Sequence, residues 1–549
     1  MITKSIQAKR ALFLVLITTL WFLYFTGGKF MNPFYVDWIF PSDTETHWLG
    51  WQFFKNESLL NFPIFKNSNY GMELGSSLVL NDSLAIMALI FKPFSSIIPF
   101  EFQYFGIWAY ICFILQSFIA MKIFENFIDD SIIVILCALL FAMLPPFLWR
   151  LHGHFGLLGH WLLIYGFFIY LTSKNLNLKS WIIIVTVSLL INAYISAMLI
   201  GIFLADLIKY KVLNSNITVK ALLGNFWKFI VFLLISLFTF GYFMIGKGAG
   251  GKGYGKFNAN LNSFFDPDQI WSVAIGNLPT PEAGYEGFGF PGIGIYLIIG
   301  LCVVTFIFRK SYAKLNNLKP YYPLIIVSLI AYVFALSNNI ILGESLVYDY
   351  EVPTFLIFLT KVFRSSGRFI WILFYLIVIS SFIFIIKSYS KRTLRILFTF
   401  IIVVQFLDLS EAKEYFNIKF NNPSVLNGRN MKWQSPMKNP IWTMVLSDYK
   451  EINYVFTKNR PKDYFPISHF AAKNNMRINT GYFSRISKTS AKKLNRRLKN
   501  IILNKTIEND TIYFIYDQEL WLFIEKNYTS PKYIATEIDN FKILAVRSN

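Results

Sequence analysis

The sequence predicts a polytopic α-helical membrane protein with about 11 transmembrane helices and a small C-terminal α/β domain outside the membrane. Three observations predict this fold class. The 549-residue chain is 55% hydrophobic and only 15% charged, whereas soluble domains are closer to a quarter charged. Apolar runs near the ~20 residues that cross a bilayer as a helix recur up to position 408. The remainder of the chain is much more polar.

The first apolar run, about 11–27, is expected to be an uncleaved signal-anchor helix. Lys4, Lys9 and Arg10 precede the run ALFLVLITTLWFLYFTGG, and no small-residue cleavage site follows it. Because basic flanks are retained on the cytoplasmic side, the N-terminus is expected in the cytoplasm and the chain that follows the first span is expected outside.

The positive-inside bias orders the later spans. The expected spans are 103–122, 131–148, 155–172, two within 180–208 that turn near Asn192, 226–245, 291–308, 321–337, 368–386 and 393–408. The apolar segment 81–99 is interrupted by prolines and charges, and counting it as a span would invert every short basic loop from Lys174 onward. We therefore expect 81–99 to lie on the membrane surface.

This topology divides the chain into a transmembrane region, 1–408, and an extracytoplasmic C-terminal domain, 409–549. Strand-like runs such as TIYFIYDQELWLFIE (511–525) indicate a mixed α/β fold for that domain. The loops expected on the outer side are 28–102, which carries the surface helices, 148–154, 246–290 and 338–367.

The formal charge of +21 and the three cysteines have simple interpretations. Lys and Arg gather in cytoplasmic loops and beside anionic headgroups, so we expect membrane lipid and no nucleic acid as the partner of this charge. Cys112, Cys137 and Cys302 all lie in apolar segments, which is typical of small buried side chains and not of a disulfide framework.

Residues 41–51, PSDTETHWLGW, place two carboxylates and an imidazole directly after the first span. Ser42 or Asp43 can cap a helix that begins here, with Glu45 in its first turn. Capping does not need both carboxylates, and His47 follows Asp43 by one helical turn. A carboxylate partly desolvated beside lipid headgroups can act as a general base. Asp43, Glu45 and His47 are therefore our candidate catalytic residues.

Residues 145–161, PPFLWRLHGHFGLLGHW, hold three of the chain's five histidines beside an arginine. A single histidine on an apolar face is usually a core residue, but polar groups at a span boundary are often functional. Arg150, His152 and His154 are therefore expected at a binding site. Together with the carboxylates of the first motif, the two histidines could instead ligate a divalent metal.

Arg364 and Arg368 lie in KVFRSSGRFIW, at the outer end of the tenth expected span. If both belong to one helix, they are one turn apart and reach the same point. A guanidinium offers a fork of donors that matches phosphate oxygens. The alternative is that both extend to lipid headgroups. Because the positive-inside bias disfavours arginine on the outer side, we expect them to bind an anion.

The glycine-rich stretch GKGAGGKGYGKF, 246–257, has the spacing of a nucleotide-binding P-loop. Phe257 stands where that motif has the Ser or Thr that holds Mg²⁺, and the stretch follows a membrane helix on the side away from ATP. We therefore reject a P-loop. A flexible external loop that contains Lys247 can instead close over a phosphate-bearing substrate.

In this order, the motifs resemble the GT-C superfamily of membrane glycosyltransferases, which includes the oligosaccharyltransferase catalytic subunit, protein O-mannosyltransferases and the lipid A aminoarabinose transferase. The resemblance rests on an acidic motif after the first span (Asp43), apolar surface helices before the second, a third span that ends in Pro-Pro followed by Arg150-x-His152-Gly153, and a C-terminal outer domain. It covers nearly the whole chain.

Within that superfamily the chain looks closest to an uncharacterised bacterial branch, through NYGMELGSS (69–77), FRSSGRF (363–369) and NNMRINTGYFSR (474–485). The resemblance implies a multi-pass, GT-C-like enzyme of the bacterial inner (cytoplasmic) membrane. Such enzymes take a sugar from a polyprenyl-phosphate or polyprenyl-diphosphate carrier at the outer leaflet. They pass it to a glycan, lipid or protein acceptor.

The resemblance also implies roles for individual residues. Asp43 would act as the base or orient the acceptor hydroxyl, and arginines would hold the carrier phosphate. The groups expected to bind the donor phosphate are Arg364, Arg368, Arg150, His152, His154 and Lys247. Because His152 and His154 stand where the metal-dependent relatives have acidic residues, dependence on a divalent metal stays open. No other cofactor is implied.

Two other classes of function remain. A lipid or oligosaccharide transporter or flippase would need ionisable groups near the bilayer midplane and interrupted spans in corresponding halves, whereas here the polar groups gather at the outer edge. A non-catalytic membrane scaffold would instead use the C-terminal domain as its binding surface.

Overall fold

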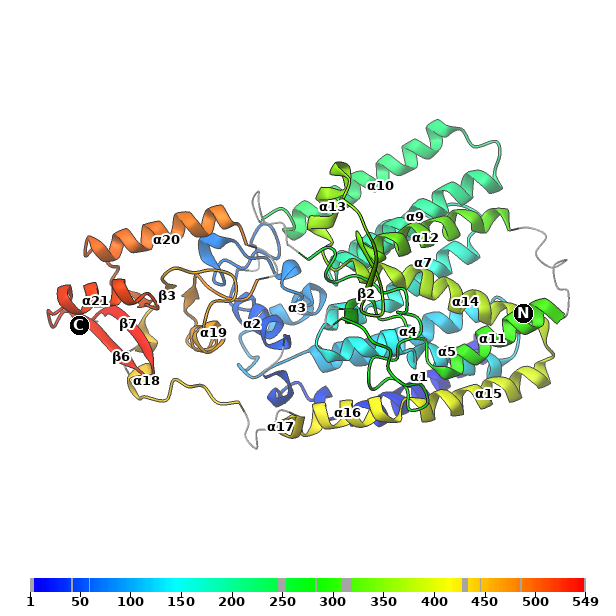
Figure 1. Ribbon diagram of the computed structural model, residues 1–549, viewed down its shortest axis with the longest axis horizontal. Coiled ribbons are helices and arrows are strands. Elements are labelled where there is room, and N and C mark those ends of the chain that lie inside the picture. The colour runs from blue at the N-terminus through cyan, green and yellow to red at the C-terminus, as the bar shows by residue number, and fades with distance from the viewer. Residues whose placement is uncertain are drawn as a thin grey trace. The chain divides into compact units, whose positions relative to one another are not determined.

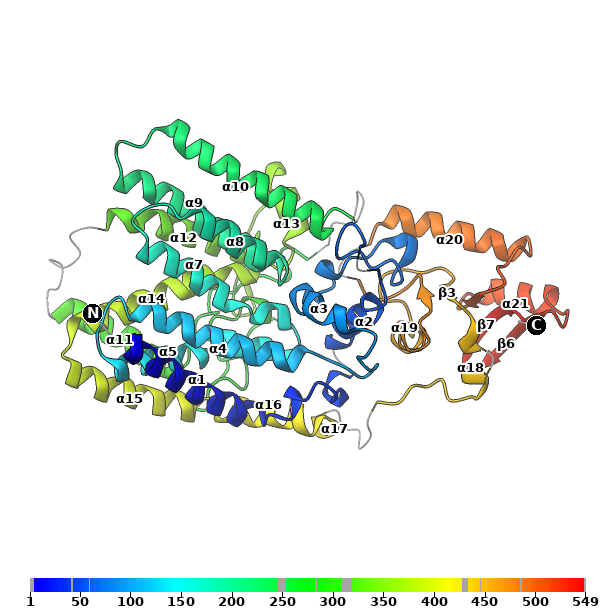
Figure 2. The same cartoon turned by 180° about the vertical axis from the view of Figure 1, so that it is seen from behind.

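The computed structural model describes residues 4–40, 43–58, 60–244, 253–281, 284–308, 318–426, 433–444, 446–483 and 486–547. The chain forms two compact units. The membrane unit comprises Met1–Trp38, Tyr104–Leu234 and Gly251–Gly428, and the second unit comprises Ile39–Gln103, Ile235–Gly250 and Arg429–Asn549. Figures 1 and 2 show the elements of both units from opposite sides.

The membrane unit is a bundle of apolar helices. Its helices are α1 (Lys4–Thr26), α4 (Phe105–Phe124), α5 (Ser131–Ala142), α6 (Pro145–Leu148), α7 (His160–Thr172), α8 (Leu178–Leu189), α9 (Ala193–Leu213), α10 (Val219–Phe240, which enters the second unit after Leu234), α11 (Ile293–Phe308), α12 (Tyr322–Leu336), α13 (Ile357–Val362), α14 (Ile370–Ser388), α15 (Lys391–Asp408), α16 (Ser410–Asn421) and α17 (Pro423–Leu426). A short hairpin, β1 (Asn339–Leu342) and β2 (Ser345–Asp349), follows α12.

Among the described residues, seven helices are long and apolar enough to cross a membrane, and two bent pairs raise the number to nine. Every expected span contains a helix, but α8 and α11 fall short of that length, so about 11 spans are not confirmed. The turn expected near Asn192 is confirmed, since its side chain accepts a hydrogen bond from the Tyr194 amide at the start of α9. The chain is therefore a multi-pass helical membrane protein.

Prolines explain the first of the two bends. The helices Ser131–Ala142 and Pro145–His152 meet at 45°. Pro145 and Pro146 lack the amide hydrogens that would continue α5, although proline suits the first turn of a new helix. The bend ends α5 and begins the short segment Pro145–His152, which contains Arg150.

Charged side chains join the helices at one end of the bundle. The Arg10 guanidinium of α1 pairs with the Glu125 carboxylate after α4 at 3.0 Å. The Arg395 guanidinium of α15 pairs at 2.7 Å with the Asp130 carboxylate, which precedes α5. The helices α1, α4 and α5 lie side by side (Figure 2). The N-terminal flank and two of the loops expected inside therefore share one end.

The opposite end of the bundle is built from loops that reach toward one another. The Asn258 side-chain amide donates to the carbonyl oxygens of Leu336 at 3.1 Å and Asn339 at 2.7 Å. The Gly367 amide donates to the Phe257 carbonyl oxygen at 3.0 Å. The loops 246–290 and 338–367 were both expected on the outer side, and their described parts do meet at one end of the bundle.

The segment 81–99 contains only a short helix, α3 (Ala85–Phe91), continued by a 3-10 turn at Lys92–Phe94. A helix of this length extends about 15 Å, roughly half of the ~30 Å hydrocarbon core. The segment is too short to span a membrane, which agrees with its expected exclusion from the spans.

The second unit contains a five-stranded sheet with the order β4-β3-β5-β7-β6. Its elements are α2 (Thr44–Phe54), α3, α18 (Ile441–Met444), β3 (Glu451–Tyr454), α19 (Tyr464–Lys473), β4 (Arg477–Ile478), α20 (Lys488–Leu503), β5 (Thr511–Phe514), α21 (Gln518–Asn527), β6 (Tyr533–Ile538) and β7 (Phe541–Val546). β3 pairs in parallel with β4 and β5, whereas β7 pairs antiparallel with β5 and β6. Parallel neighbours require crossovers, which α19 and α20 provide.

Two local features of this unit differ from the sequence expectation. The strand-like run 511–525 is strand only over β5, because the Asp517 carboxylate accepts from the Leu520 amide at 2.9 Å and begins α21. The C-terminal domain was also expected to begin at residue 409. Instead, α16 and α17 belong to the membrane unit, and the stretch Ile39–Gln103 joins the C-terminal sheet in one compact body.

Replacing Asp130 with alanine should lower the thermal unfolding midpoint of the detergent-solubilised protein. The carboxylate caps α5 by accepting from the Ile132 and Ile133 amides at 3.1 Å, and loss of such a cap costs about 1 kcal/mol. Tryptophan fluorescence during heating measures the midpoint. Asp129→Ala is the matched control, because that side chain is exposed. Equal midpoints for the two variants would contradict the assigned role.

The same carboxylate predicts how stability depends on pH. Burial raises the pKa of Asp130, but the Arg395 guanidinium and two backbone amides outweigh this and hold the pKa below its ordinary value. Its contribution is therefore present above the ordinary carboxyl pKa and lost as the pH falls through the folded-state value. Between about pH 5 and pH 3, the wild-type midpoint should fall more steeply than that of Asp130→Ala. Parallel curves would show that the interaction between Asp130 and Arg395 contributes nothing to the pH dependence of the unfolding midpoint.

Candidate functional site

Two buried arginines share one glutamate at the loop end of the membrane unit. Arg150 donates from Nη1 to Glu286 Oε2 at 3.1 Å and from Nη2 to the Glu286 carbonyl oxygen at 3.4 Å. Arg368 donates from Nε to Glu286 Oε2 at 2.8 Å and also pairs with Oε1 through Nη2. We call these three side chains the arginine–glutamate cluster.

Aromatic rings cover both guanidinium groups. The Arg150 guanidinium carbon lies 4.6 Å from the ring centroid of Trp149 and 4.6 Å from that of Trp371. The Arg368 guanidinium carbon lies 4.5 Å from the Tyr194 ring centroid. Arg150 is completely buried, and its Nε has no hydrogen-bond partner within the described residues. These stacked, planar contacts suit arginine and would not be made by lysine.

The cluster carries a net positive charge. Burial raises the pKa of Glu286, but the guanidinium groups of Arg368 and Arg150 outweigh this effect and hold the pKa below its ordinary range. Glu286 is therefore ionised at neutral pH. Its single negative charge faces two positive charges, and buried charge without full compensation is costly. An anion beside the cluster would lower that cost.

Two glycines allow the loops of the cluster to approach each other. A Cβ on Gly287 would lie 2.4 Å from the Ala259 Cα, and a Cβ on Gly367 would lie 2.7 Å from the Gly287 amide nitrogen. Real side chains do not reach such separations. The sequences YEG and SGR thereby bring Glu286 and Arg368 within hydrogen-bonding distance.

The expected helical pairing of Arg364 and Arg368 is wrong. Arg368 belongs to a 3-10 helix, Ser366–Phe369, and α14 begins only at Ile370. Arg364 precedes that helix in a non-helical stretch, since the flanking Phe363 and Ser365 have non-helical backbone angles. Ser-Ser-Gly favours such a break. Arg364 is half-buried and pairs with no carboxylate in the described part of the chain.

The two histidines of the second motif have different surroundings. His152 lies among aromatic rings, those of Trp149, Trp271, Tyr415 and Phe416. Its Nδ1 lies 2.8 Å from the Trp149 carbonyl oxygen, which can only accept, so Nδ1 carries the proton. This environment accounts for His152 as a packing residue. His154 instead acts electrostatically on the Glu286 carboxylate. Lys247 lies outside the described residues.

The first motif lies in the second unit, at the start of α2. Asp43 precedes the helix and is exposed, but its side chain makes no capping hydrogen bond. Ser42, the other expected cap, lies outside the described residues. The Glu45 carboxylate accepts a hydrogen bond from the Tyr464 hydroxyl at 2.9 Å. Glu45 therefore connects α2 to α19, and Asp43 remains accessible for chemistry.

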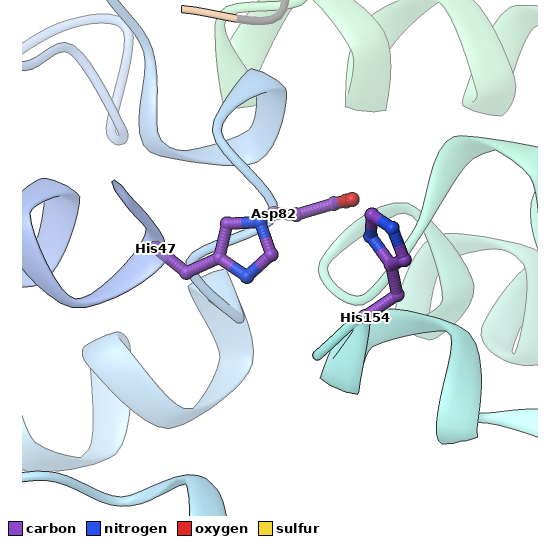
Figure 3. A group of neighbouring side chains, drawn as sticks. All are labelled: His47, Asp82 and His154. Carbon is purple, nitrogen blue, oxygen red and sulfur yellow. The ribbon is translucent and has the colours of Figure 1, made fainter. Parts of the chain in front are cut away.

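His47 and Asp82 form a carboxylate–imidazole pair in the second unit. A ligand atom of each lies within 4.8 Å of the other. Burial lowers the pKa of His47, and the carboxylates of Asp82 and Asp43 oppose that shift. Asp82 has a left-handed backbone, φ 52°, a conformation that is uncommon outside glycine and frequent at functional sites. Figure 3 labels the His47 and Asp82 side chains.

This arrangement suits acid–base chemistry. A neutral imidazole can accept a proton, and a neighbouring carboxylate then stabilises the imidazolium. The same two groups are also common metal ligands. The sequence identified the histidine and missed the aspartate.

The second unit also contains a cavity of about 250 Å³. It is lined by polar and sulfur-containing side chains together with one glycine: Lys66, Asn67, Ser68, Met72, Glu73, Gly75, Ser76, Met244 and Arg477. The Asn67 side-chain oxygen is buried and has no partner among the described residues. The cavity is smaller than the roughly 300–1,000 Å³ of typical ligand sites, so its size suits one sugar ring or a phosphate group.

Two motifs from distant parts of the chain build this cavity. The Gly71 amide donates to the Ile478 carbonyl oxygen at 2.8 Å, and the Ile478 amide donates to the Asn69 carbonyl oxygen at 2.9 Å. The Tyr70 ring packs against that of Phe483, with centroids 4.8 Å apart. NYGMELGSS and the described part of NNMRINTGYFSR therefore form one continuous structure.

Two residues of these sites were missed from the sequence, Glu286 and Asp82. A signal for the first was available, because buried arginines need a carboxylate partner. The loop 246–290 offers four: Asp266, Asp268, Glu282 and Glu286. Choosing among them requires the fold. For Asp82, the only signal of a functional role in the sequence was its position shortly after the turn-rich stretch NYGMELGSS.

Comparisons with known proteins give the family but no curated relative. No curated protein matches the chain. A family model described as "Domain of unknown function (DUF6311)" matches residues 15–410, and a second, the "DUF6311 C-terminal domain", matches residues 441–546. The two matches follow the same order as the membrane helices and the C-terminal sheet. The chain therefore belongs to the DUF6311 family.

Proposed function

We propose that this protein is a membrane glycosyltransferase that moves a sugar from a polyprenyl-phosphate-linked donor to a glycan, lipid or protein acceptor. The observation that carries the proposal is the arginine–glutamate cluster, with its net positive charge at one end of a membrane bundle. The resemblance to GT-C enzymes supports the same reaction. We assign the reaction to the outer leaflet of the bacterial inner membrane.

The chemistry of the donor explains why buried arginines favour this function. When the sugar leaves its carrier, negative charge accumulates on the carrier phosphate, and fixed positive groups stabilise that charge. The polyprenyl tail stays in the bilayer, so its phosphate is confined to the membrane surface. We assign the phosphate to the cluster and to Arg364, whose guanidinium has no carboxylate partner among the described residues.

The acceptor hydroxyl must lose a proton, and the second unit holds groups suited to remove it. We assign the base to the group formed by Asp43, His47 and Asp82. Burial favours the neutral imidazole of His47, which can take the proton, and the two carboxylates then stabilise the imidazolium. Asp43 is the alternative direct base, because its carboxylate is exposed and makes no cap.

The cavity of the second unit suits the sugar. Hydroxyl and amide groups line it, among them Asn67, Ser68 and Ser76, and these side chains can donate to or accept from sugar hydroxyls. Lys66, Arg477 and Glu73 also line it, so charged groups of both signs are available to a substituent of the sugar.

A lipid or oligosaccharide transporter is the second candidate, and a polar network inside the bundle favours it. Gln116, near the middle of α4, donates from its side-chain amide to the Tyr375 hydroxyl at 3.0 Å, and that hydroxyl lies 2.8 Å from His160 Nδ1. All three side chains are buried. Polar groups at such depth often mark transport pathways. Transport predicts movement of a lipid-linked glycan without formation of a new glycosidic bond.

Substitutions in the base group should abolish sugar transfer. Surface glycans from cells that express wild-type, Asp43→Asn or His47→Ala protein would be compared by mass spectrometry. General-base catalysis contributes roughly 10²–10⁴-fold, so at least one variant should lose the added sugar while retaining wild-type expression and melting behaviour. Asp510→Asn, which alters an exposed carboxylate of the same unit, is the control. Unchanged glycans from folded Asp43→Asn and His47→Ala proteins would refute the proposal.

Arg364→Ala should weaken binding of polyprenyl phosphate to the purified protein. A hydrogen bond to a charged group contributes about 1.5–3 kcal/mol, which corresponds to a loss of roughly tenfold to a hundredfold in affinity. Native mass spectrometry with a polyprenyl phosphate measures the change. Arg392→Ala is the matched control, because that exposed arginine lies at the start of α15, at the other end of the bundle. Equal losses from both variants would indicate non-specific attraction instead of a phosphate site.

A further inference from the structure

The loop that carries Glu286 contains a buried carboxylate, that of Asp266, and a half-buried one, that of Asp268. Asp266 is only 6% exposed and pairs with no lysine or arginine within the described part of the chain. One of its oxygens accepts from the amides of Asp268 at 3.2 Å and Leu278 at 3.1 Å. Asp268 lies two positions away, and its Oδ2 accepts from the Trp149 indole at 2.9 Å. The two carboxylates repel each other, and a cation between them would relieve that repulsion.

Both carboxylates line a small cavity rich in oxygen atoms. Its other lining residues are Asn260, Asn262, Ser263, Thr280, Gly284, Tyr285 and Phe288. The accessible space is about 20 Å³, and a cavity needs roughly 10–15 Å³ to hold one water molecule. The cavity therefore has room for one small particle.

Asn262 gives an independent indication that this space takes a ligand. The residue is 8% exposed and lines the cavity. Its amide nitrogen donates to the Pro279 carbonyl oxygen at 3.4 Å, but its side-chain oxygen is buried and has no partner among the described residues. An unpaired buried acceptor is costly, and an acceptor can be satisfied only by a donor or a cation.

We infer that this cavity is a calcium-binding site, with Asp266, Asp268 and Asn262 as its principal ligands. Carboxylate, amide and hydroxyl oxygens are ligands for a hard divalent cation, and the lining residues include no histidine or cysteine that would favour zinc. Mg²⁺ demands a near-ideal octahedral geometry and usually retains several water molecules. Ca²⁺ accepts irregular oxygen shells and suits the cavity better.

The site adjoins the arginine–glutamate cluster but does not depend on the proposed function. The Trp149 ring stacks on that of Tyr285, with centroids 5.5 Å apart, and Tyr285 both lines the cavity and precedes Glu286. A bound cation would therefore hold the loop that presents Glu286 to the arginines. That effect is structural, whether or not the protein transfers sugars.

Terbium luminescence tests the site on the full-length protein in detergent. Tb³⁺ replaces Ca²⁺ in oxygen sites and emits when a nearby indole is excited, and the Trp149 indole bonds directly to Asp268. Chelator-treated wild-type protein should give a saturable Tb³⁺ signal. Ca²⁺ should displace that signal at concentrations at which Mg²⁺ does not, and Ca²⁺ alone should raise the thermal unfolding midpoint.

Three variants locate the signal. Asp266→Asn and Asp268→Asn should each remove most of the Tb³⁺ signal, and Asn262→Ala should weaken Ca²⁺ affinity by roughly tenfold, the effect of losing about 1.4 kcal/mol. Asp349→Asn is the matched control, because that exposed aspartate lies on β2 of the same unit. The wild-type titrations stay decisive if a carboxylate variant fails to fold.

Two outcomes would overturn the inference. The first is wild-type protein with no Ca²⁺-displaceable Tb³⁺ signal and no Ca²⁺-dependent change in unfolding midpoint. The second is a signal that persists unchanged in folded Asn262→Ala and Asp266→Asn proteins, which would place the bound ion elsewhere. Neither result bears on sugar transfer, so this inference and the proposed function can fail separately.

Discussion

The loop end of the membrane unit depends on one shared carboxylate. Glu286 receives hydrogen bonds from both Arg150 and Arg368, and these three residues come from separate loops of the bundle. Without that carboxylate, two guanidinium groups would remain buried without a counter-charge, and breaking a buried ion pair costs about 3–5 kcal/mol. The close approach of the loops at Gly287 and Gly367 is what allows this interaction to form.

The sequence predicted the parts of the fold that depend on local pattern. Hydropathy located every bundle helix that was expected as a span, and Asn192 marked a turn correctly. Sequence reasoning failed where a local break in the helix, or a partner far away in the sequence, determines the structure. Ser-Ser-Gly separates Arg364 from the helix expected to carry it, and Asp517 begins a helix inside an apparent strand. Glu286 could not be selected because its pairing with Arg150 joins residues 136 positions apart.

The charges around Glu286 form a system larger than the cluster. The Asp268 carboxylate interacts electrostatically with Arg150, so the carboxylates of the small cavity act on the arginine–glutamate cluster. A divalent cation between Asp266 and Asp268 would neutralise the charges of these two carboxylates. The net positive charge of the arginine–glutamate cluster would then act on an anion without opposition from them.

The second unit is assembled from three stretches that are far apart along the chain. Asn69 and Gly71 pair with Ile478, so the early stretch obtains its hydrogen-bond partner only after nearly the whole protein has been synthesised. The membrane helices between them must be inserted first. The early stretch therefore spends most of translation with unpaired backbone groups. Maturation of this unit is consequently a late step in biogenesis, and in a chain terminated before Ile478 the cavity lined by Asn67 and Arg477 would never form.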